Sequence, residues 1–492
     1  MSWEEAKSLI AKIKFDLKNI IRKHMEKGTC SYQEAKFLLS KTESFSIPHF
    51  YIIWKVLKNP IVGRPIVAGY NWILTPASIF VGTLLKDFYG KFNGILKDSL
   101  SLVKILVKTK FNYDSFLFTV DWESLYTNIP VNDAIEMMKK LVFQFQNVIQ
   151  NAHFVIELLD IVLKNSLMTF DKEYFQQIFG IIMGTNLAPI LANLYMAMLQ
   201  EELKMKCKHD KKLKWPSLFL RFIDDGFGVM EGNKKDVEYW ILQFNNLRKS
   251  INIDKWSFGN HVEYMDLYIY KGEKFYSSGI LDFRIFQKEI NRYMYIPQKS
   301  GHVSHTIKNY VLGELKRYIR YNSLKLTFLK IRTLFFSRLR NRGFKKIWLR
   351  KQFASLKYED REKLMSEKVP DSTFSHSACQ IVLEKKAESL RTKRNRLADL
   401  GLYHNEKATN LFPMEPYRTK KGMFEKHFNQ EVQLPSFKKQ SNDSSNVVIQ
   451  GLQREKLYPG LFLQESASAK TAEKGTKTVA EKIKWKKKEE EK

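Results

Sequence analysis

The sequence has very little cysteine, and this scarcity excludes several ways of building a stabilised site. Three cysteines, Cys30, Cys207 and Cys379, occur in 492 residues. They lie too far apart for a Cys-x-x-Cys pair, so neither a disulfide framework nor a cysteine zinc site is indicated. Their number and spacing fit a reducing compartment.

The sequence also shows no secretory signal and no uninterrupted membrane-spanning run. Residues 1–28 combine apolar positions at helical spacing with many charges, which predicts an amphipathic helix instead of a leader. Residues 65–85 contain no charged side chain, but their prolines and glycines would break a spanning helix. We therefore expect no contact with a membrane and an intracellular protein, either nuclear or cytoplasmic.

Negative charge is scarce relative to positive charge. There are 82 Lys and Arg residues against 52 Asp and Glu residues, which gives a formal net charge of +30. This excess is larger than solubility requires and suggests a polyanionic partner, although a basic protein with solvated faces is the alternative. The hydrophobic content of 44%, with 13% aromatic residues, is enough to bury a substantial core.

The composition changes along the chain and suggests four segments. Residues 1–48 predict an N-terminal helical extension. Residues 49–300 mix short apolar runs, helical stretches and turn signals, which indicates an α+β domain. Residues 301–370 predict a basic helical unit, and residues 371–492 predict a largely disordered C-terminal extension because periodicity fades and charge-rich, low-complexity sequence follows.

The basic helical unit is defined by its charge. Between Lys308 and Lys351 there are 14 Lys and Arg residues and a single acid, Glu314. Leu, Ile and Phe recur between these charges at helical intervals, which predicts one apolar face and one strongly basic face.

Three aspartates lie at the ends of apolar, β-prone runs. The run 116–120 delivers Asp121 to a predicted strand end. In LFLRFIDDGFGVM, two apolar runs meet at Asp224 and Asp225, and Asp225-Gly226 is a strong hairpin signal. These residues could simply form a good turn. Paired with Asp121, however, they favour two-metal nucleotidyl transfer, in which carboxylates from separate strands converge on cations roughly 4 Å apart.

A glycine-containing turn lies between these acids. In GIIMGTNLAP, Gly180 and Gly184 permit close backbone approach, and Thr185 or Asn186 can cap a helix from Leu187 to Leu203. Such a turn can present backbone N–H groups to a phosphate or a base pair, although a plain turn is its commoner meaning.

In their order along the chain, these motifs resemble the reverse transcriptase family, most closely its Penelope-like retroelement branch. The resemblance covers about residues 30–350 and includes FLFTVDWESLYTNIP, GIIMGTNLAP and FIDDG. It implies that Asp121 and Asp224 bridge two Mg²⁺ ions, with Mn²⁺ as a possible substitute, and that Asp225 is a supporting carboxylate. One ion would activate the primer 3′-OH and the other would stabilise the leaving pyrophosphate.

The resemblance also implies contacts with the incoming nucleotide. Tyr126, five residues after Asp121, would be the aromatic gate that excludes a 2′-hydroxyl, and a tyrosine packed in the core is the alternative. Met183 and Gly184 belong to the block that contacts the new base pair, where many reverse transcriptases have Gln in place of Met. Penelope-like proteins also carry Met there.

The segment HFYIIWKVLKNPIVGRPIVAGYN resembles the fingers block of the same branch. Lys55 and Arg64 would clamp the triphosphate, since a guanidinium makes bidentate contacts to phosphate oxygens. Trp54 and Leu57 depart from the usual Pro and His of that block.

Further along, HVEYMDLYIYKG resembles the primer grip, and GELKRYIRYNS with FFSRLRNRGF resembles the thumb. Lys316, Arg317 and Arg320 would follow the template–primer backbone. Most Penelope-like elements carry a GIY-YIG endonuclease after the thumb, and no such motif pair is recognisable in this sequence.

Together these features predict an α+β right-hand polymerase, with fingers and an antiparallel palm sheet at 49–300 and a helical thumb at 301–370. The predicted function is RNA-directed DNA synthesis, in which dNTPs extend a DNA primer on an RNA template. The alternatives are a non-catalytic nucleic-acid-binding remnant of a retroelement and a nucleotidyltransferase that copies DNA or uses no template. The sequence leaves the oligomeric state unknown.

Overall fold

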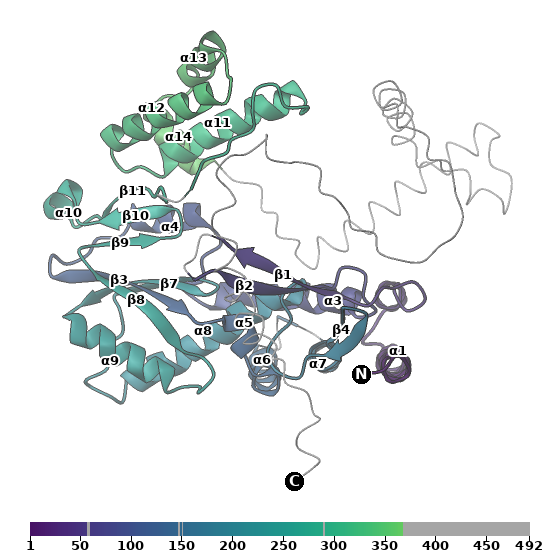
Figure 1. Cartoon of the computed structure of the whole chain (residues 1–492). Helices are drawn as coiled ribbons and strands as arrows, with labels where there is room; N and C mark the ends of the chain where they lie inside the picture. The colour runs from purple at the N-terminus through teal and green to yellow at the C-terminus, as the bar shows by residue number, and fades with distance from the viewer. Residues whose placement is uncertain (57–59, 146–147, 150, 289–290, 368–492) are drawn as a thin grey trace, which may run out of the picture. The chain divides into compact units, whose positions relative to one another are not determined.

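The structure, a computed structural model, describes residues 1–56, 60–145, 148–149, 151–288 and 291–367 (Figure 1). Helices and three separate β-sheets alternate in this part of the chain, and most strand pairs are antiparallel. The predicted α+β class is confirmed. The C-terminal extension predicted at 371–492 lies outside the described residues.

The chain begins with two capped helices, α1 (Trp3–Glu26) and α2 (Tyr32–Leu38). In each, a serine and a glutamate three residues later form a capping box that satisfies free N–H groups of the first turn. The apolar stripe of α1 is buried and packs against α7 (Ala152–Lys164). The predicted amphipathic helix is therefore confirmed, and it shares a core with the following segment.

The first sheet has the strand order β2-β1-β4-β5. Strands β1 (His49–Lys55) and β2 (Val62–Ala68) form an antiparallel hairpin, while β4 (Leu167–Phe170) runs parallel to β1 and antiparallel to β5 (Glu173–Gln176). Only the part of the hairpin near Phe50 and Val67 is buried in a core. Its far part leaves Ile53 and Trp54 exposed.

The second sheet is antiparallel, with the order β6-β7-β3-β8. Its strands are β3 (Ser115–Trp122), β6 (Leu218–Phe222), β7 (Asp225–Glu231) and β8 (Ile253–Gly259). Alternate β3 side chains, such as Phe118 and Trp122, pack against α9 (Lys234–Asn245). Asp121 therefore points to the opposite face. Helices α6 (Val131–Gln144) and α8 (Leu187–Cys207) contribute to the same core.

Further helices precede residue 279, and the first of them packs against α7 and α8 in the same core. They are α3 (Thr75–Lys86), the 3₁₀ turn η1 (Asp87–Lys91), α4 (Ser99–Leu106), α5 (Leu125–Asn128) and α10 (Glu273–Ser278).

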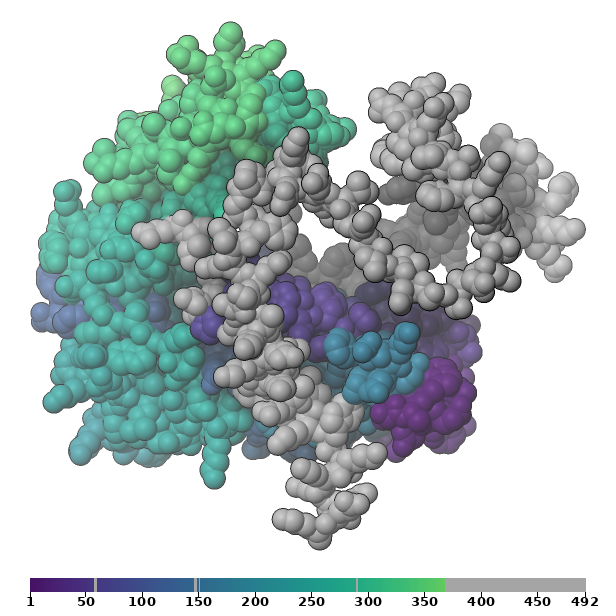
Figure 2. Space-filling model, viewed as in Figure 1, coloured from purple at the N-terminus to yellow at the C-terminus, as the bar shows by residue number. Residues whose placement is uncertain are grey.

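The third sheet, β11-β10-β9, packs against the helical unit that follows it. Its strands are β9 (His261–Tyr264), β10 (Leu267–Tyr270) and β11 (Asp282–Ile285). The unit consists of α11 (Ser304–Arg320), α12 (Lys325–Asn341), α13 (Lys346–Ala354), η2 (Tyr358–Asp360) and α14 (Arg361–Ser366). Helices thus occupy the described chain after residue 303, and their surface is drawn in green in Figure 2.

A buried polar joint fastens these helices to β11. Ser323, between α11 and α12, donates its N–H to the carbonyl of Phe283 at 2.8 Å, and its hydroxyl donates to the fully buried carboxylate of Asp282 at 2.8 Å. The Lys274 ammonium donates to the Ser323 carbonyl at 2.8 Å. Because Asp282 is satisfied by these neighbours, the joint is a specific connection.

Among the described residues, no helix is long and apolar enough to cross a membrane. The segment boundaries proposed at residues 48, 300 and 370 stay predictions.

Candidate active site

Two of the three predicted carboxylates lie on adjacent strands. Asp121 is the penultimate residue of β3, Asp225 is the first residue of β7, and the two are register partners. The Trp122 N–H donates to the Asp224 carbonyl at 3.1 Å, which fixes the turn before β7 to the end of β3. The fold thus brings together residues that are a hundred positions apart in the sequence.

The predicted hairpin between β6 and β7 is confirmed, with Asp224 in its turn and Asp225 beside the turn, as expected. Phe222 and Asp225 are the last paired residues, so Ile223 and Asp224 make the turn. Ile223 has a φ of 53°, in the left-handed region that a β-branched residue rarely adopts.

Gly226 lies inside β7 and serves a steric purpose. A Cβ atom there would come within 2.7 Å of the Val120 side chain and 3.1 Å of the Phe219 ring. The glycine therefore permits close packing of strands, and it lies just after the turn instead of within it.

The site concentrates negative charge. Burial, together with the charges of Asp121 and Asp224, raises the pKa of Asp225 to about 7, and Lys288 acts in the opposite direction. A cation at this position would offset that repulsion. In the part of the chain that the structure describes, no three His, Cys, Asp or Glu side chains gather into a cluster able to hold a metal ion.

Carboxylate oxygens at the end of the sheet nevertheless fit Mg²⁺. This ion is usually held in proteins by one or two carboxylates together with substrate phosphates and water, and it does not need a complete protein cage. Asp121, Asp224 and Asp225 supply hard oxygen donors from two strand ends.

Tyr126 lies beside this charge. It belongs to α5, the short helix that follows β3. Burial raises its pKa to about 12, the charges of Asp224 and Tyr89 act in the same direction, and Arg64 acts against them. The charges of both Asp224 and Arg64 therefore act on the Tyr126 hydroxyl.

The glycine turn is held by its backbone at two points. The Ile181 N–H donates to the Tyr126 carbonyl at 2.7 Å, and the Met183 carbonyl accepts from the Val67 N–H of β2 at 2.8 Å. Gly184 has a φ of 126°, and a Cβ atom there would collide with the Val67 carbonyl. The turn thus connects the hairpin β1–β2 to the residue proposed as the gate.

The helix after the turn begins where the sequence predicts. Helix α8 starts at Leu187 and continues past Leu203 to Cys207. The Thr185 hydroxyl accepts from the Ala188 N–H at 3.3 Å, in the manner of a capping residue.

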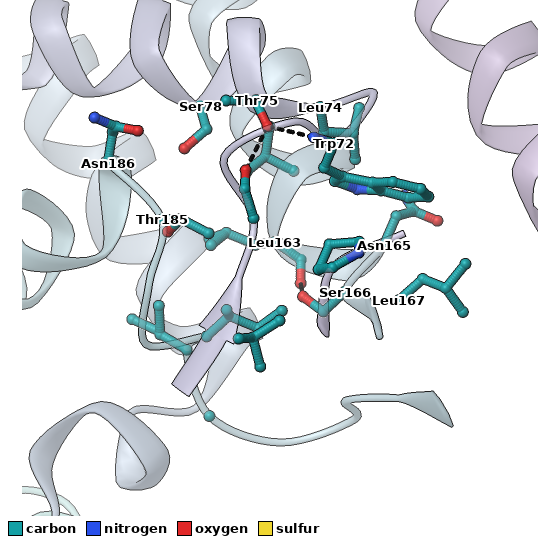
Figure 3. Close-up of a pocket in the computed structure, with 17 residues that line it drawn as sticks. Trp72, Leu74, Thr75, Ser78, Leu163, Asn165, Ser166, Leu167, Thr185 and Asn186 are labelled. Carbon is teal, nitrogen blue, oxygen red and sulfur yellow. Dashed lines mark hydrogen bonds between the residues drawn. The ribbon is translucent and has the colours of Figure 1, made fainter. Parts of the chain in front are cut away.

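A small cavity lies behind the glycine turn (Figure 3). Its lining includes Ile181, Ile182 and Thr185 from the turn segment, and Trp72 and Thr75 from the start of α3 and the residues before it. The Thr75 hydroxyl donates to the Gly69 carbonyl at 2.6 Å and accepts from the Trp72 N–H at 3.0 Å, as the dashed lines in Figure 3 show. These bonds hold the wall that faces the turn.

The two predicted phosphate-binding cations lie on one face of the β1–β2 hairpin. Arg64 pairs with Ile53, and Lys55 pairs with Val62, so Lys55 and Arg64 are diagonal neighbours on the same face. Trp54 lies on the opposite face, where its ring covers Gly63.

The three predicted thumb contacts are engaged within the helical unit. The Arg317 guanidinium binds Glu314 through two hydrogen bonds of 2.7 and 3.0 Å. Arg320 binds Glu367 at 2.8 Å, and the Lys316 ammonium lies 3.7 Å from Glu367. Their contact with nucleic acid stays a prediction. Basic residues of this unit that are exposed are Lys308, Lys325, Lys330, Arg340, Lys345, Lys346, Arg350, Lys351, Lys357 and Lys363.

Sequence reasoning missed Arg221, which lies directly under the turn. Its side chain is fully buried on β6 and donates to the Ile223 carbonyl at 2.8 Å. Burial lowers its pKa to about 10, and Tyr264, Tyr89 and Asp224 act in the opposite direction. The available signal was a charged residue inside the apolar run LFLRF, where a strand buried on both faces would normally exclude it.

The sequence matches no protein-family model and no curated protein. Among solved structures, the chain is similar to a telomerase of Candida albicans in complex with a fragment of telomeric RNA, with a TM-score of 0.44 and 9% identity over 65% of this chain and 60% of that one. It is also similar to a truncated apo telomerase of Candida tropicalis, with a TM-score of 0.38 and 14% identity over 49% of this chain and 55% of that one.

A viral polymerase shows a comparable likeness. The RNA-dependent RNA polymerase of a human picobirnavirus has a TM-score of 0.41 and 14% identity over 66% of this chain and 68% of that one. The chain spans between 55% and 60% of the length of the two telomerase structures. At these TM-scores and sequence identities, the similarity to polymerase structures is limited to the general fold. It says nothing about the activity, substrate or partners of this chain.

Proposed function

We propose that this chain is a template-directed nucleotidyltransferase with a right-hand polymerase fold. In this proposal the sheet β6-β7-β3-β8 belongs to the palm, the hairpin β1–β2 to the fingers, and α11–α14 to the thumb. The observation that carries it is the register pair Asp121–Asp225, with Asp224 in the adjoining turn and Tyr126 within electrostatic reach of that turn.

The proposed reaction is attack of a primer 3′-oxygen on the α-phosphorus of a dNTP, which forms one phosphodiester bond and releases pyrophosphate. Asp121, Asp224 and Asp225 would hold two Mg²⁺ ions, or Mn²⁺ in their place. When bound, the ions would lower the pKa of the 3′-OH and offset the charge on the leaving group. No covalent enzyme intermediate is required.

The chain's own groups would position the nucleotide. Lys55 and Arg64, on one face of the hairpin, would bind the triphosphate, because a guanidinium matches phosphate oxygens with two parallel bonds. Tyr126 would lie under the deoxyribose and exclude a 2′-hydroxyl. The backbone from Met183 to Gly184, held against β2, would contact the new base pair.

We further propose that the template is RNA and the product DNA, and that the chain derives from a retroelement. The order of the motifs and the tyrosine five residues after Asp121 support this more specific function. The net charge of +30 supports a nucleic-acid partner.

Extension of one DNA primer on matched RNA and DNA templates tests the proposal. The full chain is incubated with Mg²⁺ and either dNTPs or rNTPs, and the Asp224→Asn variant serves as the inactive control. We expect extension on RNA with dNTPs. Tight template binding without extension on either template would reject the enzyme and favour the non-catalytic nucleic-acid-binding protein.

A further inference from the structure

The guanidinium of Arg221 is an unusual buried charge. Its side chain is fully buried, and its Nη atoms donate to the Asn193 side-chain oxygen at 2.8 Å, the Asn193 carbonyl at 2.7 Å and the Ile223 carbonyl at 2.8 Å. Its Nε–H has no hydrogen-bond partner, and no carboxylate forms an ion pair with it within the described residues. A buried cation without an ion-pair partner lowers the free energy of unfolding. Its presence therefore suggests that Arg221 has a role besides stabilising the fold.

The group that Arg221 binds is part of a strained turn. Ile223 has a φ of 53°, which is unfavourable for a β-branched residue and persists only where surrounding contacts determine it. Two hydrogen bonds enclose this position: one joins Arg221 to the Ile223 carbonyl, and the other joins the Trp122 N–H to the Asp224 carbonyl. The backbone conformation that these two bonds fix at Ile223 sets the positions from which the side chains of Asp224 and Asp225 extend.

The same arginine connects the turn to elements beyond the sheet. Asn193 belongs to α8 and is buried, and its amide nitrogen donates to the Tyr89 hydroxyl of η1 at 3.2 Å. Hydrogen bonds therefore run from Ile223 through Arg221 and Asn193 to Tyr89. A forked, planar donor is needed to reach a carbonyl and an amide at once, and a lysine ammonium does not reproduce that geometry.

We infer that Arg221 is a positioning residue, which holds Ile223 in the left-handed conformation and thereby places Asp224 and Asp225 beside Asp121 for cation binding. This inference rests on the proposed function. It states that the affinity of the site for the metal depends on Arg221 as well as on the three carboxylates. Arg221 touches neither substrate nor metal; it acts through the turn.

The test measures Mn²⁺ binding by electron paramagnetic resonance, with a dNTP present, alongside primer extension and thermal unfolding of the full chain. Arg221→Lys is expected to raise the half-saturating Mn²⁺ concentration by about tenfold or more, the range found when residues that orient metal ligands are changed. Template–primer affinity should change by less than about twofold, because the buried Arg221 side chain binds no phosphate.

The decisive measurement is a rescue. Glycine adopts a positive φ without strain, so Ile223→Gly added to Arg221→Lys should restore Mn²⁺ affinity to within about threefold of the parent. An arginine that only stabilises the fold would instead lower the unfolding temperature, leave Mn²⁺ affinity unchanged and show no such rescue.

Arg248→Lys is the matched control. Arg248 also bridges elements through its guanidinium, to Asp133 at 2.8 Å and to Glu202 at 3.0 Å, but it makes no hydrogen bond to the turn. It should lose stability and keep Mn²⁺ affinity. If Arg221→Lys does not fold, Asn193→Ala takes its place, because it removes one hydrogen-bond acceptor of the guanidinium. The same increase in the half-saturating Mn²⁺ concentration is then expected.

The outcomes separate this inference from the proposed function. Unchanged Mn²⁺ affinity in Arg221→Lys, or in Asn193→Ala if it replaces that variant, overturns the inference even if the parent chain extends primers. A parent chain that binds Mn²⁺ but extends no primer overturns the polymerase, while the effect of Arg221 on Mn²⁺ binding is still measured.

Discussion

The carbonyl of Tyr126 accepts a hydrogen bond of 2.7 Å from the N–H of Ile181. The backbone of the proposed gate is therefore fixed to the glycine turn independently of its ring. Changes to the ring should affect which nucleotide is accepted and should leave the turn in place.

Tyr126→Ala is expected to admit ribonucleotides more readily, because the ring works by excluding the 2′-OH. We expect the ratio of dNTP to rNTP incorporation to fall by about tenfold or more, or about 1.4 kcal/mol in relative barrier. Tyr126→Phe keeps the ring and should keep the ratio. An unchanged ratio in the alanine variant would count against the gate.

Asp121→Asn and Asp224→Asn should each reduce primer extension by about a hundredfold or more, since each removes a metal ligand. Template binding should stay nearly unchanged, because the affinity for the template depends on cationic side chains that contact its phosphates, and neither aspartate is one of them. Asp160→Asn, on α7, where the carboxylate pairs with Lys164 at 2.7 Å, is the control. Activity within tenfold of the parent in both test variants would refute the site.

The stability of the metal-free chain should depend on pH through Asp225. Its pKa in the folded chain is about 7, above the ordinary value of 3.8. As pH rises through this interval, the unfolded chain loses the proton first, so the folded state becomes less stable. Asp225→Asn removes this penalty.

The variant should therefore unfold at a higher temperature than the parent near pH 8 and at nearly the same temperature near pH 4. Thermal unfolding in EDTA across this range measures the difference. A constant difference at every pH would show that Asp225 keeps its ordinary pKa.

The exposed basic residues of the helical unit are expected to bind the nucleic-acid backbone. Changing Lys330, Lys345 and Lys346 together to Gln should weaken binding to all sequences. It should also reduce the log–log salt slope by about 0.9 for each duplex phosphate that these side chains neutralise in the parent. Thermal stability should change little, because all three side chains are exposed. An unaltered slope would exclude this surface.

Changing Lys316, Arg317 and Arg320 together should have a second effect. Arg317 and Arg320 hold Glu314 and Glu367, so the triple variant should unfold at a lower temperature in addition to any decrease in binding. Comparing both triple variants by thermal unfolding and by salt titration separates a structural role from a binding role.

The placement of the aspartates could be predicted because the signals are local. An apolar run of β-prone residues leads to Asp121, and two such runs flank Asp224 and Asp225. The turn at Asp224 and Asp225 was predicted, but the exact pair of turn residues, Ile223 and Asp224, could not be. Gly226 looked like a turn residue, whereas contacts from Val120, a hundred positions away, require a glycine inside the strand.

Partners that are distant in sequence also explain the other differences. The sequence alone does not show that Arg221 is buried under the turn, because its hydrogen-bond partner Asn193 lies 28 residues earlier. The excess of basic residues after Lys308 correctly predicted a basic helical unit. It could not reveal that Arg320 binds Glu367, 47 residues further on, because charge composition carries no information on pairing.

The buried joint at Ser323 has a mechanical consequence. Ser323 holds β11, β11 pairs with β10, and β10 pairs with β9, where the Tyr264 hydroxyl donates to the Asp225 carbonyl at 2.9 Å. A load applied to the helices by a moving duplex would be transmitted along these hydrogen bonds to the first residue of β7. If the proposed function holds, each advance of the duplex would pull on the strand that begins with Asp225, so translocation and realignment of the proposed site would be parts of one movement.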